Sequence, residues 1–343
     1  MIVLGIETSC DDTAAAVLVD GGLRSSIVSS QDAVHGPYGG IVPELASRHH
    51  VANILAVIHA ALEQAAVGID GVEGVAVTCG PGLIGSLLVG LSAAKGIAFG
   101  KGIPLVGVNH LEGHMLAVFL ERAIAFPYIA LLVSGGHTSL YLAEDAGRYR
   151  RIGATRDDAA GEAFDKAAKM LGLGFPGGRI IDTLARGGDP RAIRFPRAAV
   201  RGGKYDFSFS GLKTALREFL RREHGVSFAS PGGVASQVLG ERLLANVAAS
   251  FQEAIVDMLV APTLGAAAEV GVTRIVVSGG VSANSRLRAR MQEEASQRAL
   301  EVHFPSARFC TDNAAMIAYA GSRRLERGEH DDLTLNAVAS LPL

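Results

Sequence analysis

Two histidines four residues apart, His110 and His114, are the residues of this sequence whose type and spacing point most directly to chemistry. Side chains at positions i and i+4 lie on one face of a helix, so both imidazoles can bind one divalent metal ion. In the H-E-x-x-H helix of zinc peptidases, the general base is a glutamate directly after the first histidine. Here Glu112 stands one position later, so that base is missing. The pattern therefore predicts a metal site and disfavours a metallopeptidase.

The elements that must position this pair predict an α/β protein with an internal repeat. Residues 1–20 and 128–143 each have two apolar stretches around a short polar turn, which is the pattern of a β-hairpin. The hairpins lie roughly 125 residues apart, a spacing of domains rather than of solenoid repeats. Beyond them we expect helices over 43–66, 83–99, 161–171, 243–259, 284–298 and 311–324, strands over 75–78, 105–108 and 274–278, and loops over 176–178 and 224–240.

The composition is that of a folded globular protein. The chain has 343 residues, of which 49% are hydrophobic and 19% charged, enough for one large or two medium domains. We find no apolar run of the roughly 18 residues that a membrane helix needs, since the best candidate, 83–94, is too short. Glu7 interrupts the N-terminal apolar run, so no signal peptide is expected. The three cysteines form no CxxC pair, which favours a reducing cytoplasm.

Charge is distributed unevenly along the chain. Residues 148–222 carry 17 basic and 8 acidic side chains, a net charge of +9, although the whole chain has a net charge of -2. A basic segment on an otherwise acidic protein suggests a local surface for a polyanion such as nucleic acid. A solvated basic face without a ligand is the alternative, and charge alone does not separate the two.

Three polar or glycine-rich turns follow apolar strands, at residues 7–13, 134–138 and 278–284. Tight glycine turns bring backbone N–H groups close to anionic oxygens. The third turn opens into a helix, whose N-terminus favours a phosphate. One such turn is weak evidence, but three turns on two repeated lobes favour a phosphate or nucleotide site.

These motifs together resemble the TsaD family of tRNA N6-adenosine threonylcarbamoyltransferases, once labelled O-sialoglycoprotein endopeptidases. The similarity spans residues 2 to about 325, and no single short pattern carries it. The motifs are Gly5-Ile6-Glu7-Thr8-Ser9-Cys10-Asp11-Asp12-Thr13, the histidine pair, Leu132-Val133-Ser134-Gly135-Gly136-His137-Thr138, Gly161-Glu162-Ala163-Phe164-Asp165-Lys166, Pro176-Gly177-Gly178, Gly279-Gly280-Val281-Ser282-Ala283-Asn284 and Thr311-Asp312-Asn313-Ala314-Ala315-Met316.

The resemblance implies an actin-like ATPase (ASKHA) fold, with two duplicated lobes around a central cleft. We expect the N-terminal lobe over 1–120 and the C-terminal lobe, with helical insertions, over 121–324. A C-terminal helix over about 325–343 is expected to pack back on the first lobe. The alternation of strands and helices read from the residues agrees with this α/β class.

The resemblance also implies an activity and its partners. The threonylcarbamoyl group would pass from threonylcarbamoyl-AMP to N6 of the adenine at position 37 of tRNAs that read codons beginning with adenine, and AMP would leave. Family members work with a TsaB-like paralogue and a TsaE-like ATPase. We therefore expect a cytoplasmic enzyme that binds tRNA and no membrane, and we leave open whether it forms homo- or hetero-oligomers.

Site residues follow from the same match. His110, His114 and Asp312 correspond to the family's metal ligands, and Asp312 is expected at the start of a helix just after a strand. Fe²⁺ is the expected ion, with Zn²⁺ or Mg²⁺ as alternatives. The remaining matches would bind the adenylate: Leu132, Val133, Ser134, Gly135 and Gly136 at the phosphate, Asp165, Gly178 and Asp182 at the ribose and base, and Asn284 at the adenine.

Two alternatives remain open for the acidic residues. Asp165 and Asp182 could instead cap helices or pair with a nearby arginine. In the first turn, Asp11 or Glu7 could act as the catalytic base. It is equally open that neither residue does. The same acids could hold Mg-ATP in an ASKHA small-molecule kinase or ATPase, a function that leaves the histidine pair unexplained. Cys10, next to Asp11, should have a raised thiol pKa, which argues against a nucleophilic thiolate.

Overall fold

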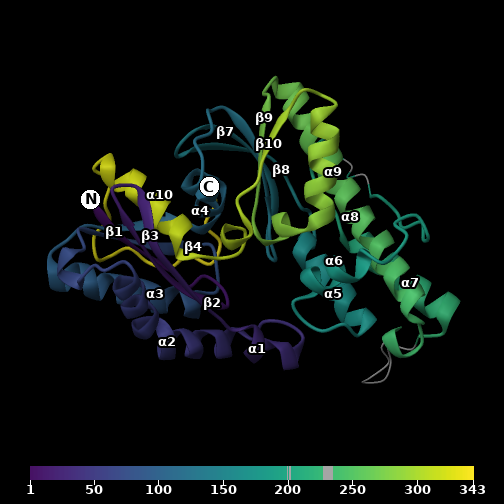
Figure 1. The fold of residues 1–343 in the computed structure, drawn as a ribbon, viewed down its shortest axis with the longest axis horizontal. Coiled ribbons are helices and arrows are strands. Elements are labelled where there is room, and N and C mark those ends of the chain that lie inside the picture. Colours follow the sequence, from purple (N-terminus) through teal and green to yellow (C-terminus); the bar gives the residue numbers. More distant parts are fainter. Residues whose placement is uncertain (199, 201, 227–234) are drawn as a thin grey trace. The chain divides into compact units, whose positions relative to one another are not determined.

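The computed structural model describes residues 1–198, 200, 202–226 and 235–343, which form two compact units. Unit 1 contains Met1–Ile124 and Pro305–Leu343, and unit 2 contains Ala125–Phe304. We expected residues 305–324 in the second lobe, and this expectation was wrong. They belong to unit 1 because helix α10 (Ala314–Glu326) packs against the strands of the first sheet (Figure 1).

Unit 1 is built on a five-stranded sheet with the order β3-β2-β1-β4-β5. Strands β1 and β2 form the predicted antiparallel hairpin, and β4 and β5 continue the sheet in parallel to β1. All seven residues of β4 are buried, as expected for a central strand covered on both faces. The strands are β1 (Ile2–Glu7), β2 (Asp12–Val19), β3 (Gly22–Ser30), β4 (Gly74–Gly80) and β5 (Leu105–Asn109).

Helices cover both faces of this sheet. Figure 1 shows α2 and α3 on one side of the strands and α10 on the other. Alternate residues of one strand therefore enter different cores: Leu4 packs with the α2 and α3 side chains, and Val3 packs with α10. Pro43 begins α2 at a position where its missing N–H costs nothing. The other helices of unit 1 are α1 (Asp32–His35), α2 (Pro43–Gln64), α3 (Ile84–Lys101) and α4 (His110–Leu116).

Unit 2 repeats this sheet. Its order is β10-β9-β6-β7-β8, which has the same connectivity as the first sheet when read from β8. Strands β6 and β7 form the second antiparallel hairpin, and β9 and β10 run parallel to β6. The predicted duplication is therefore confirmed at the level of topology. The strands are β6 (Tyr128–Val133), β7 (Thr138–Asp145), β8 (Arg148–Ala154), β9 (Arg274–Ser278) and β10 (Glu301–His303).

The helices of unit 2 pack around α8, which contacts α5, α6, α7 and α9. These helices are α5 (Ala160–Leu171), α6 (Gly177–Ala185), α7 (Ser210–His224), α8 (Glu241–Val270) and α9 (Ser285–Ser296). Short 3-10 helices in the two units lie at Gly36–Tyr38, Ile69–Gly71, Ala117–Leu120, Ala235–Gln237, Gly280–Ala283 and Ala307–Phe309.

Two of the described helices, α3 and α8, are long and apolar enough to cross a membrane by length and composition alone. Most of α8 is buried inside unit 2, and α3 packs on β4 and α2. Buried core helices pass the same test, so these two helices are weak evidence for a membrane span.

Three local expectations need correction or restriction. The segment 176–178 is not a loop throughout, because α6 begins at Gly177, whose N–H is capped by a carboxylate of α5. The expected helix over 325–343 is wrong, since α10 ends at Glu326 and the following Gly328 has a φ of 79°. The chain after it instead runs along the first sheet, with the Asp331 N–H donating to the Leu105 carbonyl. Of the expected loop 224–240, residues 227–234 lie outside the described part.

Candidate functional site

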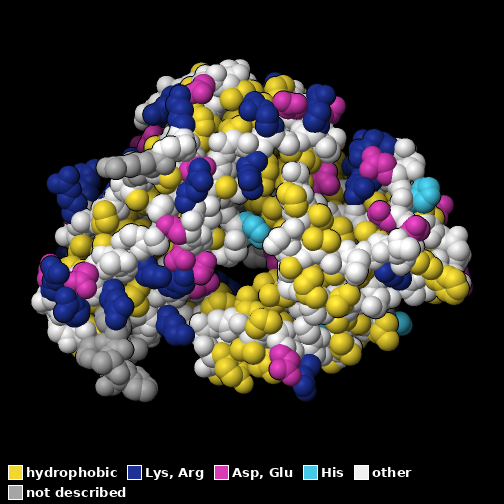
Figure 2. Space-filling model, turned by 180° about the vertical axis from the view of Figure 1, so that it is seen from behind, with side chains coloured by type: hydrophobic (Ala, Val, Ile, Leu, Met, Phe, Trp, Pro, Cys, Tyr) yellow, Lys and Arg dark blue, Asp and Glu magenta, His cyan; other side chains and the backbone are white. Residues whose placement is uncertain are grey.

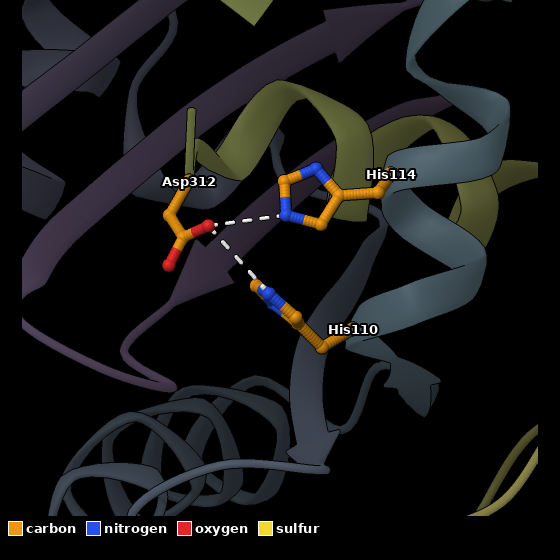
Figure 3. A group of neighbouring side chains, drawn as sticks. All are labelled: His110, His114 and Asp312. Atoms are coloured by element: carbon orange, nitrogen blue, oxygen red, sulfur yellow. Dashed lines mark hydrogen bonds and ion pairs between the residues drawn. The ribbon is translucent and has the colours of Figure 1, made fainter. Parts of the chain in front are cut away.

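His110, His114 and Asp312 come together in unit 1 (Figure 3). The two imidazoles project from α4, and Asp312 precedes α10. The Nε2 atoms of His114 and His110 lie 3.1 and 3.5 Å from the same Asp312 Oδ1 atom. Candidate ligand atoms of all three side chains lie within 4.8 Å of one another. The structure therefore brings Asp312 next to His114, although the two residues stand 198 positions apart in the sequence.

Two asparagines and a glycine fix the helices that carry these side chains. Asn109 caps α4, because its Oδ1 accepts the Leu111 N–H at 2.9 Å. Asn313 caps α10 in the same way. Gly113 faces α10 so closely that a Cβ there would lie 2.8 Å from Ile317 Cδ1. The sequence signal for both caps is an asparagine directly before a helix.

We had expected Asp312 to follow directly after a strand, and this expectation was wrong. The 3-10 helix Ala307–Phe309 lies between β10 and Asp312. Asp312 thus reaches the histidines from an irregular turn that belongs to unit 1, whereas β10 belongs to unit 2.

Glu7, at the end of β1, forms a second layer behind His110. It is fully buried, and its Oε2 accepts hydrogen bonds from Thr78 Oγ1 at 2.6 Å and from His110 Nδ1 at 3.0 Å. Its Oε1 accepts the backbone N–H of Ser9. Burial raises the pKa of the Glu7 carboxyl, but the neighbouring His110 outweighs burial and leaves it lowered. Sequence reasoning considered Glu7 only as a base or an ATP ligand and missed this contact.

The two histidines differ in their electrostatic surroundings. Burial lowers the pKa of His110, but the carboxylates of Asp312 and Glu7 outweigh burial and raise it to about 9. Burial dominates at His114 and lowers its pKa, and its Nδ1 has no hydrogen-bond partner in the described structure. Two imidazoles and a carboxylate form a donor set that fits Fe²⁺ or Zn²⁺ and leaves coordination positions open. These side chains therefore fit the metal that the family resemblance implies.

The turn after β1 adds acidic groups to the same unit. Burial, followed by the charge of Asp312, raises the pKa of Asp11 and raises that of Asp12 to about 8. The Cys10 thiol has its pKa raised well above the usual value, mainly by burial and secondarily by Asp11. The expected direction for Cys10 is confirmed, although like-charge repulsion is the smaller cause. Asp11, the candidate base, lies in this acidic turn and hydrogen-bonds to the Cys10 side chain.

In unit 2, five of the expected adenylate residues lie at the end of β6. Leu132 and Val133 are fully buried, so only their backbone can face a ligand. The next three residues form a turn that we call the SGG turn, Ser134–Gly136. The Ser134 carbonyl oxygen accepts the Gly161 N–H at 3.2 Å, and the Gly135 carbonyl oxygen accepts the Glu162 N–H. The SGG turn therefore rests directly on the first turn of α5.

The third glycine-rich turn lies beside the SGG turn. Strands β6 and β9 are parallel neighbours, with Leu132 opposite Ser278, so both turns leave the same edge of the sheet. Gly279 has a φ of 91°, and a Cβ there would lie 2.4 Å from the Val133 carbonyl oxygen. Only glycine suits this position. Two of the three predicted turns thus form one edge of unit 2.

Asp165, Asp182 and Asn284 accept hydrogen bonds from residues in the first turns of α6 and α9. Asp165 Oδ1 accepts the Gly177 N–H at 2.7 Å, next to Gly178 in the first turn of α6. Asp182 Oδ1 accepts from Ser285 Oγ at 2.7 Å, at the start of α9. Asn284 caps α9 and donates to an amide oxygen of α8. The capping alternative for the two aspartates is therefore present, and contact with a ribose remains a prediction.

Comparisons with known proteins give a consistent result. The family model "TsaD: tRNA N6-adenosine threonylcarbamoyltransferase" matches residues 22–319. A protein of this name from Pelobacter propionicus is 54% identical, with 99% of this chain and 97% of the relative covered. One from Anaeromyxobacter dehalogenans is 56% identical, with 98% and 97% covered.

Solved structures show the fold alone, because their sequences differ strongly. HypF of T. kodakarensis has a TM-score of 0.61 at 14% identity and covers 95% of this chain and 48% of its own. Component A of the (R)-2-hydroxyglutaryl-CoA dehydratase of Acidaminococcus fermentans has a TM-score of 0.52 at 16% identity and covers 93% and 96%. The expected actin-like ATPase fold with two duplicated units is thereby confirmed.

Proposed function

Because the chain belongs to the TsaD family of tRNA N6-adenosine threonylcarbamoyltransferases, we propose that its acyl donor is threonylcarbamoyl-AMP and its acceptor is N6 of adenine 37. The acceptor tRNAs would be those that read codons beginning with adenine. That the protein is a transferase acting on tRNA follows from the family match over nearly the whole chain. The relatives reported above give no support to a kinase or a peptidase.

The proposed reaction fits the chemistry of its two partners. An aromatic exocyclic amine is a weak nucleophile, so the carbonyl must be activated as a mixed anhydride with phosphate. N6 attacks the carbamoyl carbon, the bond between that carbon and the phosphate oxygen breaks, and AMP leaves. The N6 proton passes to a base, for which Asp11 is our candidate because it lies half-buried in the acidic turn after β1 and burial raises its pKa. The protein must orient both partners and stabilise charge on the carbonyl and phosphate.

The single observation that best supports a metal-assisted transfer is the cluster of buried His110 and His114 with half-buried Asp312. Bound by these residues, a divalent ion would supply Lewis acidity for the carbonyl or the leaving phosphate. We propose Fe²⁺ as this ion. Imidazole ligands suit Zn²⁺ as an alternative better than Mg²⁺, which prefers oxygen ligands alone.

The adenylate is proposed to bind at the β6–β9 edge of unit 2. Exposed Gly135 and Gly136 offer backbone N–H groups to the phosphate. Asp165, Gly178 and Asp182 would face the ribose and base, and Asn284 the adenine, where carboxylate oxygens can accept from ribose hydroxyls. Leu132 and Val133 would take part through their backbone only.

For tRNA, we propose the basic segment 148–222 as part of the binding surface. Arg148, Arg150 and Arg151 are exposed on β8, which is an edge strand of the second sheet. Guanidinium groups in such a position can bind phosphates without reading sequence. The proposed tRNA substrate agrees with a cytoplasmic enzyme.

A TsaB-like paralogue and a TsaE-like ATPase are the proposed protein partners. Val51 and Leu55 on α2 are 66% and 72% exposed, and Ile84 and Leu88 on α3 are 43% and 42% exposed. The two helices pack side by side, and Figure 2 shows hydrophobic side chains gathered on the part of unit 1 where they lie. Such a patch is typical of an interface. We propose that the TsaB-like subunit covers it, forming a hetero-oligomer.

Incubation of the protein with threonylcarbamoyl-AMP and unmodified tRNA tests the proposed function. Nucleosides from the digested tRNA are analysed by mass spectrometry, with and without the TsaB-like and TsaE-like proteins. We expect threonylcarbamoyl-adenosine at position 37 in at least the complete mixture. Its absence from every combination would refute the proposed donor and acceptor.

A further inference from the structure

We propose that Glu7 is a positioning residue for the metal centre, and that its carboxylate holds His110 in the tautomer with hydrogen on Nδ1 and a free lone pair on Nε2. This inference rests on the proposed metal site and assigns a new role within it. Metal-bound histidines commonly donate their second N–H to a carboxylate, which fixes the ring and strengthens the ligand. Here the buried Glu7 lies behind His110, on the side of the ring away from Asp312.

The hydrogen position on His110 follows from its two neighbours. Nδ1 lies 3.0 Å from Glu7 Oε2 and 3.1 Å from Ser9 Oγ. A bare Nδ1 would turn its lone pair toward a buried carboxylate oxygen, which is repulsive. An N–H group there makes a charge-assisted hydrogen bond, and the hydroxyl of Ser9 can rotate to suit either partner. In the neutral ring, Nε2 therefore carries the lone pair that a metal requires.

His114 provides an internal contrast. Its Nε2 also faces Asp312, at 3.1 Å, but its Nδ1 has no hydrogen-bond partner in the described structure. The surroundings therefore fix the tautomer of His110 and leave that of His114 to the metal. A change at Glu7 should affect one ligand and leave the other two in place.

Replacement of Glu7 by glutamine is a sharp test because the backbone dictates the orientation of the new amide. The Ser9 N–H donates to Oε1 in the native protein, so the glutamine must keep its oxygen at that position. Its NH2 group then takes the place of Oε2 and points at His110 Nδ1. Nδ1 must accept, and the hydrogen of the neutral ring moves to Nε2, where it blocks the metal. The Thr78 hydroxyl can rotate from donor to acceptor.

The matched control is Thr78→Val. It removes a hydrogen bond to the same carboxylate oxygen at 2.6 Å but leaves the contact between Glu7 and His110 intact. If the network merely stabilises the fold, both variants should weaken metal binding to a similar extent. If Glu7 positions His110, only Glu7→Gln should do so.

Two measurements on the full chain test the proposal. The first is the Kd for Co²⁺, Zn²⁺ and Fe²⁺, followed by the visible bands of Co²⁺ and by competition. Glu7→Gln should raise each Kd about 10- to 100-fold, the usual effect of losing such a partner, and Thr78→Val should raise it less than about twofold. An unchanged Kd in Glu7→Gln would overturn the proposal.

The second measurement is the NMR signal of the His110 Nδ1–H, in metal-free and Zn²⁺-loaded protein labelled with ¹⁵N-histidine. We expect a downfield, exchange-protected signal in the wild type and in Thr78→Val, and its loss in metal-free Glu7→Gln at a pH where the His110 ring of that variant is neutral. A wild-type protein without this signal would overturn the role of Glu7. A wild-type protein that has the signal but binds none of the ions would instead overturn the proposed metal centre, so the two failures are distinguishable.

Discussion

Asp12 is predicted to destabilise the metal-free protein at neutral pH. Its side chain lies mostly out of solvent, and its Oδ1 has no hydrogen-bond partner among the described residues. Burial, followed by the charges of Asp312 and Asp11, raises its pKa to about 8. In the unfolded chain, an aspartate ionises near pH 3.9. Between these values the folded state binds one proton more than the unfolded state, so stability falls as pH rises.

The size of this loss of stability follows from the shift in the pKa of Asp12. Each pH unit between about 4 and 8 costs about 1.4 kcal/mol, which amounts to about 4 kcal/mol at pH 7. Asp12→Asn removes the ionisation and keeps the shape of the side chain. The variant should therefore match the wild type near pH 4 and exceed its stability by up to about 4 kcal/mol at pH 7. For a domain of the size of unit 1, this corresponds to a Tm increase of about 10 °C.

Thermal unfolding followed by circular dichroism, in chelator and at several pH values from 4 to 8, measures this difference. Asp20→Asn is the matched control. Asp20 is exposed, and the N-terminal amine lowers its pKa, so its replacement should bring no gain as pH rises. Its φ of 50° is one that asparagine tolerates. A Tm difference between Asp12→Asn and the wild type that does not widen with pH would refute the reasoning.

Three further predictions concern the other parts of the site. Gly161→Ala would place a Cβ 2.6 Å from a carbonyl oxygen of the SGG turn. Calorimetry should therefore show AMP binding weakened at least about tenfold. The control variant Gly96→Ala, which has open space around the new Cβ, should bind AMP normally. Asp312→Asn should lower metal content at least about tenfold in elemental analysis, because the charged ligand is lost, and a full complement of metal would contradict its role. Leu55→Glu should abolish co-elution with the TsaB-like protein, whereas Ile69→Glu, an exposed apolar residue outside α2 and α3, should not; equal binding by both would exclude the proposed surface.

Local patterns predicted much of the fold. The hairpins at 1–20 and 128–143 were found because their apolar strands and polar turns are complete within a short stretch of sequence. The duplication followed from their repetition and is seen in the matching strand orders. The end of the chain was mispredicted, because residues 327–343 are held by long-range contacts with β4 and β5 rather than by a helical pattern of their own.

Local patterns also predicted only part of the candidate site. His110 and His114 are recognisable as a pair from local spacing, whereas Asp312 was assigned only through the family resemblance. The role of Glu7 depends on the pairing of β1 with β4 and on the position of α4, which no local pattern encodes. Asp165 and Asp182 were expected at a ligand, and the structure shows that they also hold the starts of α6 and α9.

The central claim is that this chain transfers the threonylcarbamoyl group with the help of a metal held by His110, His114 and Asp312. The most direct test measures metal content and single-turnover transfer from threonylcarbamoyl-AMP to tRNA on the same samples of wild type and His114→Ala, in the presence of both partner proteins. We predict that the variant loses the metal and the transfer together while its circular dichroism spectrum is unchanged. Full transfer by a folded variant that contains no metal would contradict the claim.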